Sequence, residues 1–121
     1  MPLRTLSSRL KDRVTIQEKD LIDNGKGGRR PRDPAAPWKD LARGVAAEVI
    51  ALRGDEALRE GVERSTRLWR VTIRARRGLS PAMQIVWDDP VMGATAMNIR
   101  TMAPNEARDG IVMTCESGVT S

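Results

Sequence analysis

Residues 64–77 read RSTRLWRVTIRARR, and this stretch decides the fold. Within it, apolar side chains alternate with arginine and threonine: Trp69, Val71, Ile73 and Ala75 against Arg70, Thr72, Arg74 and Arg76. A period of two sends successive side chains to opposite faces of a β-strand, so the stretch predicts a strand with one apolar and one arginine-rich face. No acidic residue occurs between its first arginine and Trp87. The segment therefore predicts both a β fold and an anionic or acidic partner.

Five further segments show strand patterns and are separated by turn signals: 13–18, 45–52, 83–87, 94–102 and 111–116. Six short strands with almost no helix predict an all-β fold, a small antiparallel β-barrel, because closing a barrel removes exposed sheet edges. We interpret residues 1–121 as a single domain of this kind.

Three segments lie outside the strand pattern. Residues 1–12 form a basic N-terminal arm, either a short helix or an ordered extension. Residues 19–37 contain a glycine cluster and three prolines, which predicts a long, flexible, basic loop without regular elements. Residues 53–66 carry charges of both signs, and glycines bracket residues 54–61 as one short helical turn.

The composition predicts a lean core and an uneven distribution of charge. The chain has three tryptophans and no phenylalanine or tyrosine, so we expect modest stability as a monomer and support from neighbouring subunits. The net charge of +5 divides into +5 over residues 1–44, +3 over 45–77 and −3 over 78–121. This distribution suits head-to-tail packing of identical copies, or docking on an acidic partner or on nucleic acid. Alternatively, these charges only form a solvated surface that keeps the protein soluble.

The residue types argue against catalysis. Without histidine the chain lacks the commonest general base and metal ligand, and Cys115 shares a strand face with Ile111 and Met113, as a buried small hydrophobe would. The glycine cluster continues into arginine and proline rather than into the lysine and hydroxyl residue of a phosphate-binding loop. We therefore expect no enzymatic activity, cofactor or metal. A single cysteine fits a reducing compartment, and no apolar run approaches the roughly 20 residues that span a membrane, so we expect no membrane partner.

Nucleic-acid binding is an alternative function that the sequence leaves open. A basic loop and an arginine face are the electrostatic footprint of a small β-barrel that binds nucleic acid. Three tryptophans offer few platforms for stacked bases, so such binding would be mostly to phosphate, nonspecific and sensitive to salt.

A series of short signatures then identifies a family by its order along the chain. They are residues 10–17 (LKDRVTIQ), a glycine-rich loop, Trp38 with Leu41, residues 46–49 (AAEV), 52–56 (LRGDE), 71–74 (VTIR), 78–79 (GL), 83–86 (MQIV), 97–99 (MNI), Arg108, and Cys115 with Glu116. This order and spacing resemble the phage head-tail joining family, also called head-closure or stopper proteins, over nearly the whole chain. Family members often have an aromatic residue where this chain has Val45, Ala75 and Met97.

The resemblance implies a β-barrel protein that assembles as a ring, expected to be twelvefold, beneath the portal and adaptor proteins of a tailed phage. Such a ring retains packaged DNA in the head and offers a platform for the tail terminator or other tail proteins. Related proteins occur in prophages and gene transfer agents. The expected location is therefore the head-tail interface of a virion or phage-like particle, after synthesis in the bacterial host cytoplasm.

The resemblance also implies roles for three groups of residues. The segment 53–66 is expected to close the channel as a gate, through Arg53, Gly54, Asp55, Glu56, Arg59, Glu60, Glu63 and Arg64. The arginine strand is expected to contact neighbouring subunits or the DNA in the channel, through Arg67, Arg70, Arg74 and Arg76. The basic loop 19–37 is expected to contact adjacent connector proteins, through Lys26, Arg29, Arg30 and Arg32.

Overall fold

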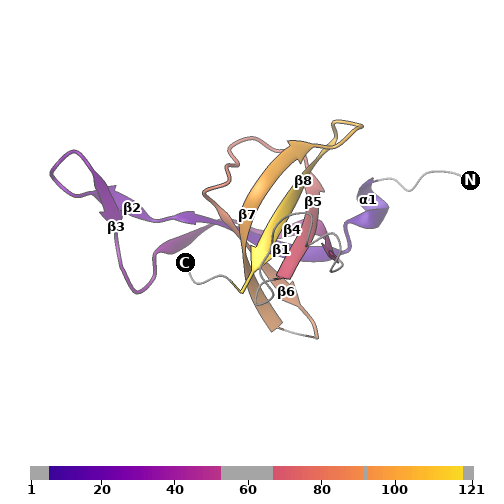
Figure 1. Ribbon diagram of the computed structural model, residues 1–121, viewed down its shortest axis with the longest axis horizontal. Coiled ribbons are helices and arrows are strands. Elements are labelled where there is room, and N and C mark those ends of the chain that lie inside the picture. Colours follow the sequence, from indigo (N-terminus) through magenta and orange to yellow (C-terminus); the bar gives the residue numbers. More distant parts are fainter. Residues whose placement is uncertain (1–5, 53–66, 92, 119–121) are drawn as a thin grey trace, which may run out of the picture.

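The protein is a closed six-stranded barrel with a separate two-stranded hairpin that projects from one side (Figure 1). The structure, a computed structural model, describes residues 6–52, 67–91 and 93–118. In chain order the elements are α1 (Leu6–Arg9), β1 (Asp12–Lys19), β2 (Leu21–Asp23), β3 (Arg29–Pro31), β4 (Trp38–Ala51), β5 (Arg67–Arg74), β6 (Gln84–Asp89), β7 (Gly93–Pro104) and β8 (Gly110–Ser117). Around the barrel the strand order is β1-β4-β5-β8-β7-β6, and all pairs are antiparallel. The expectation of a small antiparallel barrel is confirmed.

The inward faces of the six strands fill the barrel with aliphatic and sulfur-containing side chains. The fully buried members of this core are Val14, Ile16, Ala47, Val71, Ile73, Ile85, Met97, Met113 and Cys115. Met97 stands where related proteins often have an aromatic residue, and a flexible thioether can fill such a space. The barrel is therefore a packed core rather than a pore.

Two tryptophans meet inside one mouth of the barrel. Trp69 on β5 and Trp87 on β6 lie on strands that face each other across the barrel, with ring centroids 5.1 Å apart and planes inclined at 66°. The indole Nε1 of Trp69 donates a hydrogen bond to Ser117 Oγ at 2.9 Å. An edge-to-face pair of this kind adds to the energy of area burial, which offsets part of the shortage of aromatic residues.

The strand expected from the arginine stretch is present as β5, with two corrections. It ends at Arg74, so Arg76 lies in the connection to β6 rather than on the strand. Thr72, on the arginine side, is 1% exposed, so this outer face is not open to solvent along its whole length. Arg9 of α1 bonds to Glu48, the β4 residue paired with Thr72, and Leu6 reaches Gly110 on β8.

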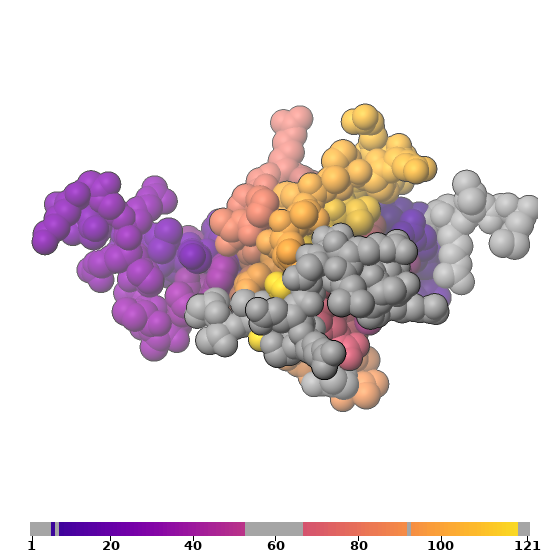
Figure 2. Space-filling view, in the orientation of Figure 1, coloured from indigo at the N-terminus to yellow at the C-terminus, as the bar shows by residue number. Residues whose placement is uncertain are grey.

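The prediction that residues 19–37 form no regular element is wrong, because β2 and β3 pair as an antiparallel hairpin in this segment. Asn24 organises its turn: its side-chain Oδ1 accepts hydrogen bonds from the backbone N–H groups of Lys26 and Gly28 at 2.7 and 3.1 Å. The hairpin and α1 lie at opposite ends of the molecule, and the hairpin stands out from the barrel as a separate lobe (Figures 1 and 2).

Strand β4 is also longer than expected, since it begins at Trp38 rather than near Val45. Its pairing with β1 shifts register between Val14 and Ile16, and Gly44 has φ +63° beside this irregularity. A bulge of this kind breaks the period of two, which conceals the first half of the strand in the sequence. The helical turn expected at 54–61 lies outside the described residues.

Candidate assembly surfaces

The arginine strand presents two of its expected contact residues on one outer face. Arg70 and Arg74 are exposed on β5. Arg67 belongs to the other parity and lies at the barrel mouth, with its guanidinium carbon 5.7 Å from the centroid of the Trp69 ring. Arg76 follows the end of the strand and is exposed. The four arginines expected to act together therefore occupy three different places.

The acidic last third of the chain is not remote from this arginine face. Strand β8 pairs with β5 along its whole length, so that Glu116 lies opposite Leu68, two residues from Arg70. Asp88 and Asp89 lie at the end of β6, on the opposite side of the barrel from β5. The other two acidic residues of the last third, Glu106 and Asp109, lie in the β7–β8 turn. The acidic residues of the last third are thus spread around the barrel and do not form one acidic end.

The hairpin carries the basic residues expected for partner contact. Lys26, Arg29, Arg30 and Arg32 are all exposed. Arg32 is tied to the hairpin base, since its Nε lies 3.4 Å from Asp20 Oδ1 and its backbone N–H donates to the Asp20 carbonyl at 2.8 Å. The other three cations line the turn and β3.

A hollow of about 450 Å³ lies where the hairpin meets the barrel. It is lined by four apolar and two cationic side chains: Leu21, Pro31, Pro37, Trp38, Lys19 and Arg29. The ammonium group of Lys19 lies 5.9 Å from the centroid of the Trp38 ring, in the range of a cation–π contact. The hollow combines an apolar floor with positive charge.

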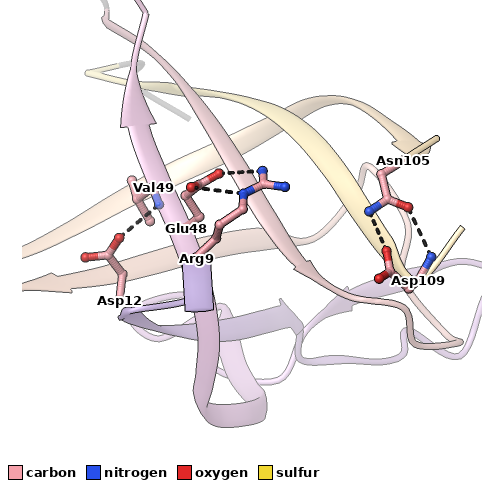
Figure 3. A network of polar contacts seen from close by, with 6 residues as sticks. All are labelled: Arg9, Asp12, Glu48, Val49, Asn105 and Asp109. Carbon is pink, nitrogen blue, oxygen red and sulfur yellow. Dashed lines mark hydrogen bonds and ion pairs between the residues drawn. The ribbon is translucent and has the colours of Figure 1, made fainter. Parts of the chain in front are cut away.

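Two polar clusters hold α1 and the β7–β8 turn in place (Figure 3). Arg9 donates from Nη2 and Nε to the two carboxylate oxygens of Glu48, at 2.8 and 3.3 Å. This hydrogen bond, more than the charge of the same carboxylate, raises the pKa of Arg9. Asp12 Oδ2 accepts from the backbone N–H of Val49 at 3.0 Å, which ties the start of β1 to β4.

The β7–β8 turn is organised by Asn105. Its Oδ1 accepts from the backbone N–H group of Asp109 at 3.1 Å, and its Nδ2 donates to Asp109 Oδ1 at 2.7 Å (Figure 3). The same Oδ1 also accepts from the backbone N–H group of Gly110 at 3.2 Å. Arg108 in this turn has φ 59°, a left-handed conformation that is uncommon outside glycine and asparagine. The turn is thus a fixed projection with an exposed arginine at its tip.

A third polar cluster joins β1, β4 and β6 on the barrel. Gln84 Nε2 donates to Gln17 Oε1 at 2.6 Å, and Gln17 Nε2 donates to Asp40 Oδ1 at 2.8 Å. The hydrogen bond from Gln17, followed by that from Arg43, lowers the pKa of Asp40. These contacts cross two strand pairs and reinforce the barrel wall.

The described residues offer little for catalysis or metal binding. Burial raises the pKa of the Cys115 thiol to about 12, which keeps it protonated and unreactive at neutral pH. Among residues 6–52, 67–91 and 93–118, no group of three or more histidine, cysteine or acidic side chains is arranged to hold a metal ion. No helix in this part of the chain is long and apolar enough to cross a membrane. The expected gating residues in 53–66 lie outside the described residues, so their role stays a prediction.

The sequence interpretation missed the hollow and the clamp on α1. In the sequence Trp38 is one of several short signatures, but Lys19 and Leu21, which line the hollow with it, come from other strands. Arg9 and Glu48 are 39 residues apart, and no local pattern connects them. A contact between residues so far apart in the sequence can be recognised only when the position of α1 relative to β4 is known.

Comparison with known proteins places the chain among phage proteins. The family model described as phage head completion protein matches residues 6–118. No curated protein matches the chain. Among solved structures, the solution structure of protein SF1141 from Shigella flexneri 2a is similar, with a TM-score of 0.71 and 23% sequence identity over 97% of this chain and 100% of that chain. At that identity the likeness shows a shared fold.

Proposed function

The chain belongs to the phage head completion protein family, and from this premise we propose that it is a structural connector between the head and the tail of a tailed phage or phage-like particle. In this proposal, identical copies form a twelvefold ring beneath the portal and adaptor proteins. The ring closes the DNA channel and offers a platform to the tail terminator or other tail proteins.

The observation that carries the proposal is the extent of the family match, which covers every described element from α1 to β8. The geometry supports a role exercised through outer surfaces. The barrel interior is filled by aliphatic side chains, so DNA has no path through a single subunit. A channel must then lie between subunits, bounded by their outer faces and turns.

The alternative of a nucleic-acid-binding barrel receives less support. Trp69 and Trp87 are partly buried and pack against each other inside the barrel mouth, which makes them poor platforms for stacked bases. The exposed arginines of β5 suit subunit contact or the lining of a DNA channel, where the partner is phosphate rather than base.

Co-sedimentation tests the connector role directly. The purified protein is expected to be monomeric or weakly associated alone, and to join portal–adaptor rings in stoichiometric copies. Failure to sediment with those rings would remove the proposal. DNA binding that falls steeply with salt, without ring association, would favour the alternative function.

The role of the arginine strand is tested by a double substitution. Arg70→Ala with Arg74→Ala should reduce loading onto portal–adaptor rings while the thermal unfolding midpoint changes little, because both side chains are exposed. Lys11→Ala with Arg13→Ala makes the same change of net charge at two other exposed positions and should load normally. Equal loading by both double variants would show that Arg70 and Arg74 are ordinary solvated surface residues without a role in assembly.

A further inference from the structure

The hollow at the hairpin base has a chemistry that defines its occupant. Leu21, Pro31, Pro37 and Trp38 give it an apolar floor, and Lys19 and Arg29 put positive charge beside that floor. Its volume of about 450 Å³ is in the range of small-molecule sites, so it has room for a valine side chain. A matching ligand would present one apolar group next to carboxylates.

Such a group is present on the surface of the same chain. Three large apolar side chains are exposed among the described residues, and Val91 is by far the most exposed, at 88% compared with 40% for Leu41 and Ile50. Val91 lies in the β6–β7 turn directly after Asp88, Asp89 and Pro90. Ile50 instead pairs with Arg70, so its surroundings are basic.

A local hydrogen bond holds Val91 next to the end of β6. Asp89 Oδ1 accepts a hydrogen bond from the backbone N–H of Val91 at 2.9 Å, which closes a local turn. Asp88 is exposed beside it. The turn thus presents a valine projection flanked by negative charge, which complements the hollow in shape and in sign.

Within one subunit the two features cannot meet. The hairpin projects to the left in Figure 1, whereas β6 runs to the lower end of the barrel. A contact between them must therefore join two copies. When two copies are joined in this way, the first still has a free hollow and the second still has a free Val91. Such a heterologous contact repeats from subunit to subunit, and it closes as a ring when the rotation between copies allows.

We propose that Val91 of one copy, with Asp88 at the end of β6, docks into the hollow between the hairpin and β4 of the next copy. Asp88 then lies near Lys19 and Arg29, and Val91 contacts the apolar floor around Trp38. This contact rests on the proposed connector function and specifies the surface through which its ring is built.

A charge exchange tests the electrostatic part of the contact. Arg29→Glu and Asp88→Arg should each weaken self-association about tenfold, because each sets like charges against each other at a partly buried interface. The combined variant Arg29→Glu with Asp88→Arg should recover most of the association. Arg13→Glu makes the same charge change at an exposed position of β1 that does not line the hollow, and should leave association unchanged. Sedimentation velocity over a concentration series measures the effect, and additive losses in the combined variant would overturn the contact.

Disulfide trapping tests the geometry. The full chain with Val91→Cys and Leu21→Cys should give a ladder of covalent oligomers under mild oxidation on portal–adaptor rings. A mixture of the two single variants should stop at dimers, since each copy then offers one thiol to the contact. Cys115 is fully buried and contributes little background. Absence of cross-links while rings form, or an internal disulfide within monomers, would overturn the contact.

The outcomes separate this contact from the connector function. If the protein loads onto portal–adaptor rings but gives no ladder of covalent oligomers, the connector role is supported and the proposed contact is contradicted. A ladder in solution without any loading onto portal–adaptor rings supports the contact and removes the connector role.

Discussion

At the scale of single residues, Thr72 shows how the outer face of the arginine strand departs from a simple ladder. Its side chain is 1% exposed, and its Oγ1 is one of two buried side-chain polar atoms without a hydrogen-bond partner in the described part of the chain. The sequence places Thr72 correctly on the arginine side of β5. Its burial does not follow from strand parity, which places Thr72 on the same face as the exposed Arg70 and Arg74.

The unpaired hydroxyl leads to a prediction. Thr72→Val replaces Oγ1 with a methyl group of similar size and should raise the free energy of unfolding by about 1 kcal/mol, because the cost of burying an unpaired hydroxyl is removed. Urea unfolding followed by circular dichroism measures the change. Thr114→Val on the neighbouring strand, where the threonine is only half-buried, is the control and should have a smaller effect. A loss of stability in Thr72→Val would mean that the hydroxyl has a partner such as water.

At the scale of elements, the sequence predicts the strands well where apolar and polar residues alternate strictly. Residues 13–18, 83–87 and 111–116 fall within β1, β6 and β8 apart from one residue, because their inward side chains are all apolar. The hairpin was missed because β2 and β3 have three residues each, too few to show a period. Its turn is held by hydrogen bonds to the side chain of Asn24 and contains glycines at positive φ, and both features are equally typical of an irregular loop.

The surfaces proposed for assembly were only partly predictable for the same reason. Arg70 and Arg74 could be placed on an outer face because strand parity alone determines it. The hollow joins residues of β1, β2, β3 and the start of β4, so it depends on the hairpin pairing and on the bulge at Gly44. Neither the hairpin pairing nor the bulge produces a periodic pattern of apolar residues in the sequence.

The contact between α1 and β4 gives a prediction for the N-terminal element. A double-mutant cycle with Arg9→Met and Glu48→Gln should give a coupling energy of about 0.5–1 kcal/mol, since the pair is bidentate but its side chains remain 36% and 19% exposed. The same variants should speed amide hydrogen exchange in α1. Arg43 with Asp40 is a more exposed pair and should show a smaller coupling. Equal couplings would show that the first pair does not fix α1.

At the scale of the whole molecule, the barrel and the hairpin are separate structural units. The core cluster contains no residue between Asp20 and Pro37. The two ends of the hairpin are already joined, because the backbone N–H of Asp20 donates to the carbonyl of Pro37 at 2.7 Å. The barrel therefore has no structural need for the segment that carries the hollow.

Removal of the hairpin tests this independence. Replacing residues 21–36 with a short Gly-Ser turn should shift the melting temperature by less than about 4 °C, equivalent to about 1 kcal/mol or less. The same variant should fail to load onto portal–adaptor rings. Ile73→Ala, in the fully buried core, should cost about 2–5 kcal/mol and confirms that the assay detects loss of barrel packing. A large drop in melting temperature on hairpin removal would show that the two units fold together.

The three tryptophans give this chain a set of optical reporters. Because tyrosine and phenylalanine are absent, the near-ultraviolet absorption and the intrinsic fluorescence come from Trp38, Trp69 and Trp87 alone. Trp69 and Trp87 touch across the barrel, so the coupling between their electronic transitions records whether the barrel is closed. Trp38 lines the hollow, and its emission responds to whether water or another subunit covers it. Unfolding and docking can thus be followed in the unlabelled protein as two distinct spectroscopic signals.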